Sequence, residues 1–440
     1  MKLLVFAHTP PPHHGQSYMV QLMLAGFGGD QRKSHKNYKG AEKKERAPGS
    51  RPQESDPYGV ECYHVDARLS QKLEDIGDFR IGKLLLLLGY CLQAIWCRIR
   101  YGVTNFYYIP APGKRSALYR DWVVMFICRC FFKRVILHWH AAGLAKWLET
   151  SVQIRSRAFT YRLMKQVDLS IVLSRYNQAD AEKLYSRQIR VVNNGIPDPC
   201  PEFEKDVLPR RTARFEARRR LFSGQQPGEN LAQLGDDPHV IKVLYLAHCT
   251  REKGLFDTIS GVVLANERLA DQSIPLTVRL LVTGNFVTEE EREVFNGIIT
   301  QIRMARMVDY LGFVSGQKKN ELLREADLFC FPTFYQNENQ PVNLIEAMAF
   351  GLPILTTRWR SIPELFPANY AGLVGIRSPD QIAASLLKLA RTESGEGFRG
   401  IFLTGFTLSR HLAGLAEAFR NVEEQKNVRT DEVPVVSNSL

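Results

Sequence analysis

The sequence predicts an α/β protein made of two Rossmann-like domains that face each other across a cleft. Short apolar runs, typical of buried parallel strands, alternate with helical stretches along the chain. The alternation occurs twice, once on each side of a segment at 199–238 that is rich in charge, proline and glycine. Strands that alternate with helices favour parallel sheets, whose ligands bind at the carboxyl ends of the strands.

The first domain is expected over residues 1–200. It opens with an apolar run at 2–7, a loop that contains Gly15, and a helix at 18–27. A strand, a glycine-containing loop and a helix form the start of a Rossmann-like half. The remaining strand candidates of this domain are 62–65, 106–109, 135–138, 169–173 and 190–192.

Residues 29–57 interrupt this pattern. They are rich in Lys, Arg, Glu, Ser and Pro, and they lack large aliphatic side chains after Asp30. Such a segment cannot bury a core, so we expect a disordered insertion. Two roles are open for it: a solvated loop without function, or a basic loop that contacts an anionic acceptor or a membrane.

A linker is expected at 201–237 and a second α/β domain at 238–405. The strand candidates of this second domain are 240–246, 276–282, 308–311, 328–331, 354–357 and 373–374. Residues 406–440 are expected to form a C-terminal helix that ends near residue 425, followed by a frayed tail.

The most informative segment reads Glu-Asn-Gln-Pro-Val-Asn-Leu-Ile-Glu, from Glu338 to Glu346. Pro341 suits the first position of a helix and Gly351 the position just past its end. We therefore expect Glu338 in a loop and Glu346 on the short helix that follows. A helix start attracts a diphosphate, and a carboxylate accepts hydrogen bonds from a ribose diol. The spacing alone also fits a surface helix that happens to carry two acids.

With Ala-Met-Ala-Phe-Gly-Leu-Pro after it, this segment resembles the E-x7-E signature of retaining glycosyltransferases of the GT-B fold, family 4 type. The resemblance implies an enzyme of the hexosyltransferase type that moves a sugar from a nucleoside diphosphate sugar to an acceptor hydroxyl. It assigns the ribose hydroxyls to Glu346, and the donor sugar to Glu338 with the backbone N–H groups that follow. The other donor-binding positions implied in this segment are Asn339, Gln340, Pro341, Val342 and Asn343.

A second candidate is the loop Ala-His-Cys-Thr-Arg-Glu-Lys-Gly at 247–254, directly after the first strand of the second domain. Basic groups there can stabilise a departing diphosphate. The loop resembles the family's Gly-Arg-x-x-x-x-Lys-Gly: Lys253 and Gly254 match, whereas His248 stands where arginine is frequent. Neutral histidine stabilises a phosphate less than arginine does, and Arg251 is the candidate to compensate. A lysine on a solvated turn is the alternative.

Four further candidates are implied by the resemblance. His140, which follows a buried strand, is expected to contact the transferred sugar from the first domain, with His138 the weaker candidate. Gly15 is expected near the donor phosphate and the acceptor, although Gln16 stands where a second glycine is common. Phe313 and Val314 are expected beside the nucleotide base, with core packing of Phe313 as the alternative. The resemblance also implies that the C-terminal helix crosses onto the first domain.

No metal or other cofactor is expected. The sequence has no Asp-x-Asp triplet, and its eight cysteines form no C-x-x-C pair. A net charge of +12 suits an anionic partner, but the basic stretch at 32–51 carries only Tyr38 as an aromatic, which argues against nucleic acid. Two competing hypotheses are a GT-B isomerase, such as a sugar nucleotide 2-epimerase, and a catalytically dead partner subunit.

Residues 84–97 form an apolar stretch that is too short to span a bilayer. It suits either a core helix of the first domain or a membrane-docking face, flanked by Arg80, Lys83, Arg98 and Arg100. The apolar run at 3–7 is too short for a signal peptide. We therefore expect a cytoplasmic enzyme, at the inner face of the membrane if residues 80–100 make a peripheral contact. Its partners would be a nucleotide sugar donor and a saccharide or lipid-linked acceptor, in cell-envelope polysaccharide or glycolipid assembly.

Overall fold

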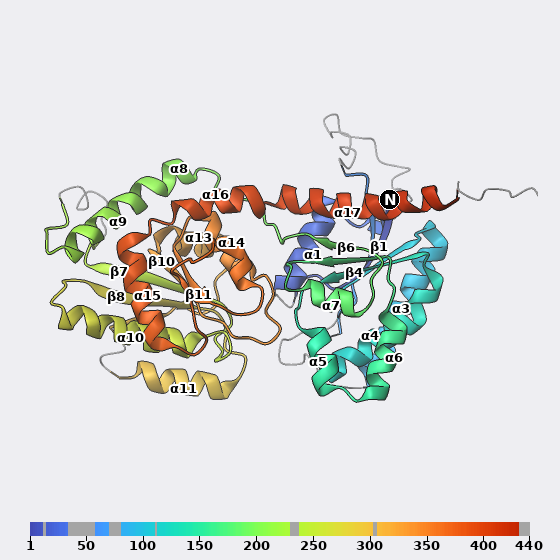
Figure 1. The fold of residues 1–440 in the computed structure, drawn as a ribbon, viewed down its shortest axis with the longest axis horizontal. Coiled ribbons are helices and arrows are strands. Elements are labelled where there is room, and N and C mark those ends of the chain that lie inside the picture. Colours follow the sequence, from blue (N-terminus) through green and yellow to red (C-terminus); the bar gives the residue numbers. More distant parts are fainter. Residues whose placement is uncertain are drawn as a thin grey trace, which may run out of the picture. The chain divides into compact units, whose positions relative to one another are not determined.

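The computed structural model describes residues 1–11, 15–33, 58–69, 81–110, 112–228, 237–301 and 306–430. Most of the insertion expected at 29–57, and the end of the expected tail, lie outside these residues. The described chain forms two compact units (Figure 1). The first unit is Met1–Asn194 together with the C-terminal helix α17 (Leu408–Thr430), and the second is Gly195–Thr407.

The first unit is built on a six-stranded parallel sheet with the strand order β2-β1-β3-β4-β5-β6. Its strands are β1 (Lys2–Phe6), β2 (Glu61–Val65), β3 (Asn105–Tyr108), β4 (Arg134–Trp139), β5 (Leu169–Val172) and β6 (Ile189–Val191). Its other helices are α1 (Gly15–Gly26), α3 (Ile81–Tyr101), α4 (Arg115–Cys128), the 3-10 helix η1 (Arg129–Phe131), α5 (Leu144–Ser151), α6 (Ile154–Met164) and α7 (Gln178–Lys183).

Successive residues of β1 enter different cores, because side chains alternate between the two faces of a strand. Leu4 and Phe6 join the core formed with α3 and α4, whereas Leu3 and Val5 join the core formed with α1 and α17. The sheet therefore lies between two helical layers. Both faces are covered, so the carboxyl edge of the strands is the part of the sheet left for a site.

The C-terminal helix α17 belongs to the first unit, although the whole second unit precedes it in sequence. Leu412, Leu415 and Phe419 are buried in the core that α17 shares with α1. A Cβ atom at Gly26 of α1 would come within 2.3 Å of Leu412, so the close packing of these two helices depends on glycine there. The helix continues to Thr430, further than the sequence pattern indicated.

Helix α3 is longer than the apolar stretch that predicts it. By length and composition Gly82–Tyr101 could cross a membrane, whereas the apolar run at 84–97 alone is too short to do so. Nevertheless Leu87, Cys91, Ala94 and Cys97 are buried against the first sheet. One face of α3 is therefore part of the core, as one of the two sequence hypotheses expected.

The second unit contains another six-stranded parallel sheet, with the order β12-β11-β10-β7-β8-β9. Its strands are β7 (Val240–Leu246), β8 (Thr277–Thr283), β9 (Val308–Tyr310), β10 (Leu328–Phe331), β11 (Ile354–Thr357) and β12 (Leu373–Val374). The chain adds β8 and β9 on one side of β7 and then β10 to β12 on the other. The strand order thus reverses between β7 and β10, where parallel sheets normally bind ligands.

The helices of the second unit cover this sheet and lead into its loops. They are α8 (Phe203–Asp206), α9 (Leu208–Phe222), α10 (Leu255–Asp271), α11 (Glu289–Ile299), α13 (Gly316–Glu325), α14 (Val342–Ala349), the 3-10 helix η3 (Ile362–Leu365), α15 (Pro379–Thr392) and α16 (Glu396–Gly405). Two parallel-sheet α/β domains were predicted, and both are present. The predicted arrangement of the domains about a cleft stays a prediction.

The segment expected as a linker contains α8 and α9, and buried ion pairs hold α9 in place. Arg211, Arg214 and Arg218 share one side of the helix and are buried. Arg214 donates to both carboxylate oxygens of Asp327, at 2.8 and 2.7 Å, and Arg218 donates to the same carboxylate at 2.6 Å. Burial alone would raise the pKa of Asp327, but the two arginines hold it well below its ordinary value. Arg214 and Arg218, in the segment expected as a linker, therefore anchor α9 to the start of β10.

Candidate functional site

Two loops meet at the carboxyl edge of the second sheet, where β7 and β10 lie side by side. Residues 247–254 follow β7, and residues 332–341 follow β10 and lead into α14. The Phe334 N–H donates to the carbonyl of Glu252 at 2.8 Å, and Thr333 Oγ1 lies 3.3 Å from the same carbonyl oxygen. These bonds hold the two predicted motifs against each other.

Gly254 makes this close approach sterically feasible. Its φ is +82°, and a Cβ atom there would come within 2.4 Å of the carbonyl oxygen of Pro332. A side chain at this position would therefore force the two loops apart. Gly254 also precedes the first residue of α10, so it fixes where Lys253 enters the site.

Lys253 and Glu338 form an ion pair. Lys253 Nζ lies 2.6 Å from Glu338 Oε2, and both side chains are mostly buried. Thr333 Oγ1 donates to the same carboxylate oxygen at 3.1 Å, and the Tyr335 ring centroid lies 4.4 Å from Lys253 Nζ. The sequence predicted separate tasks for the two charged residues. The structure brings them together, and it adds Thr333 and Tyr335, which the sequence analysis did not single out.

The short helix after Glu338 begins one residue later than expected. Pro341 has a ψ of 125°, which is extended backbone, so it is the N-cap and α14 starts at Val342. The Pro341 side chain makes no hydrogen bond that caps this helix start. Asn343 Nδ2 donates to the carbonyl of Leu246 at 2.9 Å, which ties α14 to the end of β7. The N–H groups of the first turn of α14 therefore lie at the same sheet edge as Lys253.

Glu346 lies on α14 and pairs with a lysine that the sequence did not reveal. Its carboxylate accepts a short hydrogen bond from Lys319 Nζ of α13, and the Glu346 side chain is mostly buried. Asn339, before the helix, is held by Ser361 Oγ, which donates to Asn339 Oδ1 at 3.0 Å. Gln340 is also buried. The alternative of an exposed surface helix with two acids is wrong, because both acids are buried and paired.

His248 and Arg251 occupy the loop between β7 and α10. Tyr245 donates its hydroxyl hydrogen to the carbonyl of His248 at 2.9 Å. Burial, reinforced by the nearby Lys253, lowers the pKa of His248, so its imidazole is neutral at pH 7. The Arg251 guanidinium lies 5.0 Å from the ring centroid of Phe256 on α10. Whether either side chain contacts a phosphate stays a prediction.

Residues after β8 and β9 complete this edge of the sheet. Phe313 is 56% exposed, so the alternative of core packing is wrong, whereas Val314 is buried. The Gly284 N–H donates to the carbonyl of Gly312 at 2.9 Å. Gly284 was not singled out, yet a Cβ atom there would lie 1.8 Å from the carbonyl oxygen of Ala247. The triplet Thr-Gly-Asn after an apolar strand was the available signal.

The candidates of the first unit lie at the carboxyl edge of its own sheet. His138 is buried, and its Nδ1 lies 2.5 Å from the hydroxyl of Tyr107. Burial, with His140 and His411 nearby, holds the pKa of His138 well below its ordinary value. The half-buried His140 follows β4, and its ring centroid lies 4.2 Å from that of His138. Gly15 is exposed at the first position of α1.

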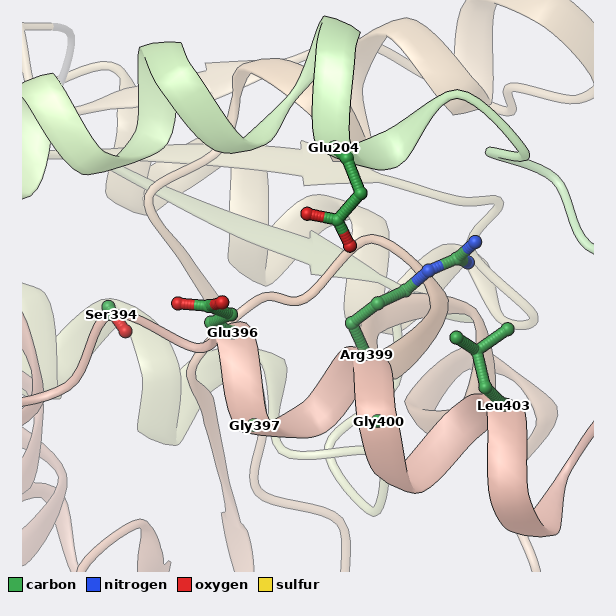
Figure 2. Close-up of a pocket in the computed structure, with 7 residues that line it drawn as sticks. All are labelled: Glu204, Ser394, Glu396, Gly397, Arg399, Gly400 and Leu403. Carbon is green, nitrogen blue, oxygen red and sulfur yellow. The ribbon is translucent and has the colours of Figure 1, made fainter.

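A hollow of about 460 Å³ lies elsewhere on the second unit, next to α8 and α16 (Figure 2). It is lined by Glu204, Ser394, Glu396, Gly397, Arg399, Gly400 and Leu403. Arg399 forms an ion pair with Asp198, in which Nη2 donates to Oδ2 at 2.6 Å. None of the predicted site residues lines this hollow, and its two glutamates would repel a diphosphate. The candidate site therefore rests on the loops at the sheet edge.

A group 1 glycosyltransferase model matches the part of the chain that holds these loops. The family is described as "Glycosyl transferases group 1", and the match covers residues 229–396.

In the described residues, no group of three His, Cys, Asp or Glu side chains is placed to hold a metal ion. The expectation of a metal-independent site stays a prediction.

Curated relatives match over a similar length. The amylovoran biosynthesis glycosyltransferase AmsK of Erwinia amylovora is 29% identical over 178 residues, which are 39% of this chain and 41% of that protein. WcaL of Escherichia coli K12, named for colanic acid biosynthesis, is 29% identical over 161 residues, which are 36% of this chain and 37% of that protein. The chain thus spans about two fifths of the length of these relatives.

Solved structures match almost the whole chain. HepE of Anabaena, in complex with UDP and glucose, has a TM-score of 0.59 and 15% identity, covering 96% of this chain and 100% of that one. Sucrose-phosphate synthase from Thermosynechococcus elongatus has a TM-score of 0.63 and 16% identity, covering 97% and 100%. Such low identity shows the fold alone. Residues 229–396 are thus similar to the glycosyl transferases group 1 family, within a chain that has the GT-B fold.

Proposed function

We propose that this protein is a retaining glycosyltransferase of the family 4 type. It moves a hexose from a nucleoside diphosphate sugar to a hydroxyl of a saccharide or lipid-linked acceptor, in the cytoplasm, during polysaccharide or glycolipid assembly. One observation carries the proposal: Lys253, Glu338 and the start of α14 converge where the strand order of the second sheet reverses. The names of AmsK and WcaL, and the UDP complex of HepE, support it.

The diphosphate of the donor binds at the cationic end of this site, where Lys253 and the start of α14 lie. An ammonium group has three N–H donors, and the contact with Glu338 uses one of them, so Lys253 can also donate to phosphate oxygens. The first-turn N–H groups of α14, from Val342 onward, add donors and the positive end of the helix dipole. Arg251 and His248, whose imidazole is neutral, lie in the same loop as Lys253. Charge that develops on the departing diphosphate is therefore stabilised without a metal ion.

The remaining groups hold the nucleoside and the sugar. Glu346 accepts hydrogen bonds from the ribose hydroxyls, with Lys319 orienting its carboxylate. Phe313 and Val314 lie beside the base. Glu338, with the backbone of Asn339 and Gln340, binds the sugar hydroxyls. During transfer the bond between the anomeric carbon and the diphosphate oxygen breaks, a bond to the acceptor oxygen forms, and the proton of the acceptor hydroxyl passes to the departing diphosphate.

The first unit contributes the groups that act on the sugar and acceptor. His140 contacts the transferred sugar, and Gly15 lets the backbone at the start of α1 approach the donor. His138 keeps His140 in place, because it is buried and fixed by Tyr107. Its role is therefore to position the neighbouring ring rather than to touch substrate.

A nucleotide screen tests the binding step. UDP, GDP, ADP and CDP are each added to the full chain, and the unfolding temperature is recorded. A ligand that binds the folded protein raises this temperature, so we expect one nucleoside diphosphate to stand out. Lys253→Met should remove that shift, whereas Lys388→Met, an exposed lysine on α15, should leave it unchanged. If no nucleotide shifts the wild type, the proposal is wrong.

A turnover assay tests the reaction. The full chain is incubated with the matching nucleotide sugar and a panel of glycan acceptors, and release of the nucleoside diphosphate is followed. We expect turnover to persist in EDTA and NMR of the product to show the donor's anomeric configuration. Glu338→Gln should reduce turnover strongly. Conversion of the donor to a different nucleotide sugar without any acceptor would instead identify an isomerase.

A further inference from the structure

Helix α3 is apolar on the side that faces solvent as well as on the side that faces the core. Leu85, Leu92, Trp96 and Ile99 are between 52% and 76% exposed. They recur at spacings of seven, four and three residues, which places them on one side of a helix. We call these four residues the α3 stripe. A surface helix of a soluble protein normally carries polar side chains there, so the stripe indicates a partner.

Neighbouring elements also expose apolar side chains. Arg98 Nε of α3 donates to the carbonyl of Phe131 at 3.1 Å, which joins the end of α3 to η1. Phe131 is partly exposed, and Phe126 on α4 is 70% exposed. The helices α3 and α4 pack together, and α4 also packs on α6, so all three share one side of the first unit (Figure 1). The apolar surface therefore extends over more than one helix.

Basic residues accompany this apolar surface. Helices α3, α4 and α6 together carry eight Lys and Arg residues, and their one acid, Asp121, is buried. Arg100 lies beside Ile99 and is exposed, and Lys133 follows η1 and is exposed as well. The Lys133 N–H donates to the carbonyl of Thr104, just past the end of α3, at 2.9 Å. Positive charge thus lies next to the apolar stripe.

We infer that this surface docks on a membrane that contains anionic phospholipid. Exposed Leu, Trp and Ile side chains enter the boundary between headgroups and acyl chains, and the flanking Arg and Lys side chains bind lipid phosphates. The helix lies along the membrane rather than across it, because its opposite face is built into the first core through Leu87, Cys91, Ala94 and Cys97. A second copy of this chain is a poorer occupant, since it would bring the same positive charge.

The inference does not depend on the proposed function, because it concerns residues remote in sequence from Lys253, Glu338 and Glu346. It does explain how a sugar-transferring enzyme would reach an acceptor carried by a lipid. Binding of vesicles and binding of a nucleotide can therefore be measured separately on the same protein. Failure of one measurement leaves the other interpretable.

The test is co-sedimentation of the full chain with vesicles. One set contains phosphatidylglycerol and phosphatidylethanolamine, and the other contains phosphatidylcholine alone. We expect binding to the anionic vesicles, little to the neutral ones, and release as salt rises, because salt screens the lipid charge. The variant Leu92→Ser/Trp96→Ser/Ile99→Ser should bind the anionic vesicles at least about tenfold more weakly than the wild type does. Val294→Ser/Leu403→Ser, which removes exposed apolar side chains of the second unit, should bind like the wild type.

A charge variant separates the basic contribution. Arg100→Gln/Lys133→Gln should weaken binding to anionic vesicles and flatten its salt dependence, whereas Lys388→Gln/Arg391→Gln on α15 should not. Circular dichroism confirms that each variant is folded. Wild type that fails to sediment with anionic vesicles overturns the inference, and so does equal binding by the stripe variant. A protein that is dimeric in solution, and becomes monomeric in the stripe variant, would identify a second copy as the partner instead.

Discussion

Lys253 is held between a carboxylate and an aromatic ring, and this arrangement decides what it can do. Its ammonium lies 2.6 Å from Glu338 Oε2 and 4.4 Å from the ring centroid of Tyr335. The pair is mostly buried, so it is weakly screened by solvent. The ammonium is therefore fixed in place before any ligand arrives, which reduces the entropic cost of binding a diphosphate.

Replacing Lys253 with methionine should weaken diphosphate binding specifically. Methionine keeps much of the side-chain volume but removes the charge, and a hydrogen bond to a charged group contributes about 1.5–3 kcal/mol, or roughly tenfold to hundredfold in affinity. By titration calorimetry we expect that loss for the nucleoside diphosphate that the screen selects and no loss for its nucleoside, which has no phosphate. Equal losses for both would mean that the substitution disturbs the site as a whole.

The sequence pointed to Lys253, Glu338 and Glu346, because each stands in a local motif. It could not point to Lys319 or Tyr335. Lys319 reaches Glu346 only because α13 and α14 are neighbours in the fold, and no spacing along the chain encodes that. The exposure of Phe313 was equally hidden, since an aromatic residue after a strand is compatible with either core or surface.

Helix α9 shows how a charged sequence can build a core. Two of its buried arginines, Arg214 and Arg218, pair with one buried acid, Asp327, which also accepts a hydrogen bond from the Lys242 N–H at 2.8 Å. The spacing of Arg211, Arg214 and Arg218 along a single helix side was the signal that a linker assignment missed. The linker expectation rested on the content of charge, proline and glycine, which does not reveal that the acid at the start of β10 pairs with two of these arginines.

Asp327→Asn should destabilise the second unit strongly. Removal of one partner leaves two buried guanidinium groups without their carboxylate, which costs about 3–5 kcal/mol. Urea unfolding followed by circular dichroism measures this change in the free energy of unfolding. As a matched control, Asp380→Asn breaks the exposed pair with Arg268 and should change it by no more than about 0.5 kcal/mol. A small effect at Asp327 would show that the network does not anchor α9.

A buried histidine on helix α17 makes the free energy of unfolding of the first unit depend on pH. His411 is buried, and burial lowers its pKa to about 4, while its Nδ1 bonds the carbonyl of Asn193. Between pH 6.5 and 4 the unfolded chain therefore binds a proton at this residue that the folded chain excludes. Stability rises with pH across that window and is lost as pH falls, by about 3 kcal/mol for this group.

His411→Gln should flatten this dependence. We expect the unfolding temperature of the variant to fall less than that of the wild type between pH 6.5 and pH 4. Some dependence should remain, because burial also lowers the pKa of His8 to about 4. The exposed His239→Gln variant should follow the wild-type curve. Identical curves for His411→Gln and wild type would refute the assignment.

At the scale of the whole molecule, hydrophobic alternation was enough to predict two parallel-sheet domains, and the strand candidates fall on the observed strands. The strand orders could not be read from the sequence, because they depend on which sheet edge each new strand joins. The carboxyl-edge location of the site followed from the parallel topology alone. The division of tasks between the units, with the nucleotide on the second and His140 on the first, stays a prediction.

The most direct test of the central claim is calorimetric titration of the full chain with the nucleoside diphosphate that the screen selects. Three forms of the chain are compared: wild type, Glu346→Gln and His140→Gln. If the second unit alone holds the nucleotide, Glu346→Gln should bind this ligand about tenfold more weakly, through loss of a charged acceptor for the ribose hydroxyls. His140→Gln should bind it as the wild type does, while losing sugar transfer. Undiminished affinity in Glu346→Gln would contradict the account.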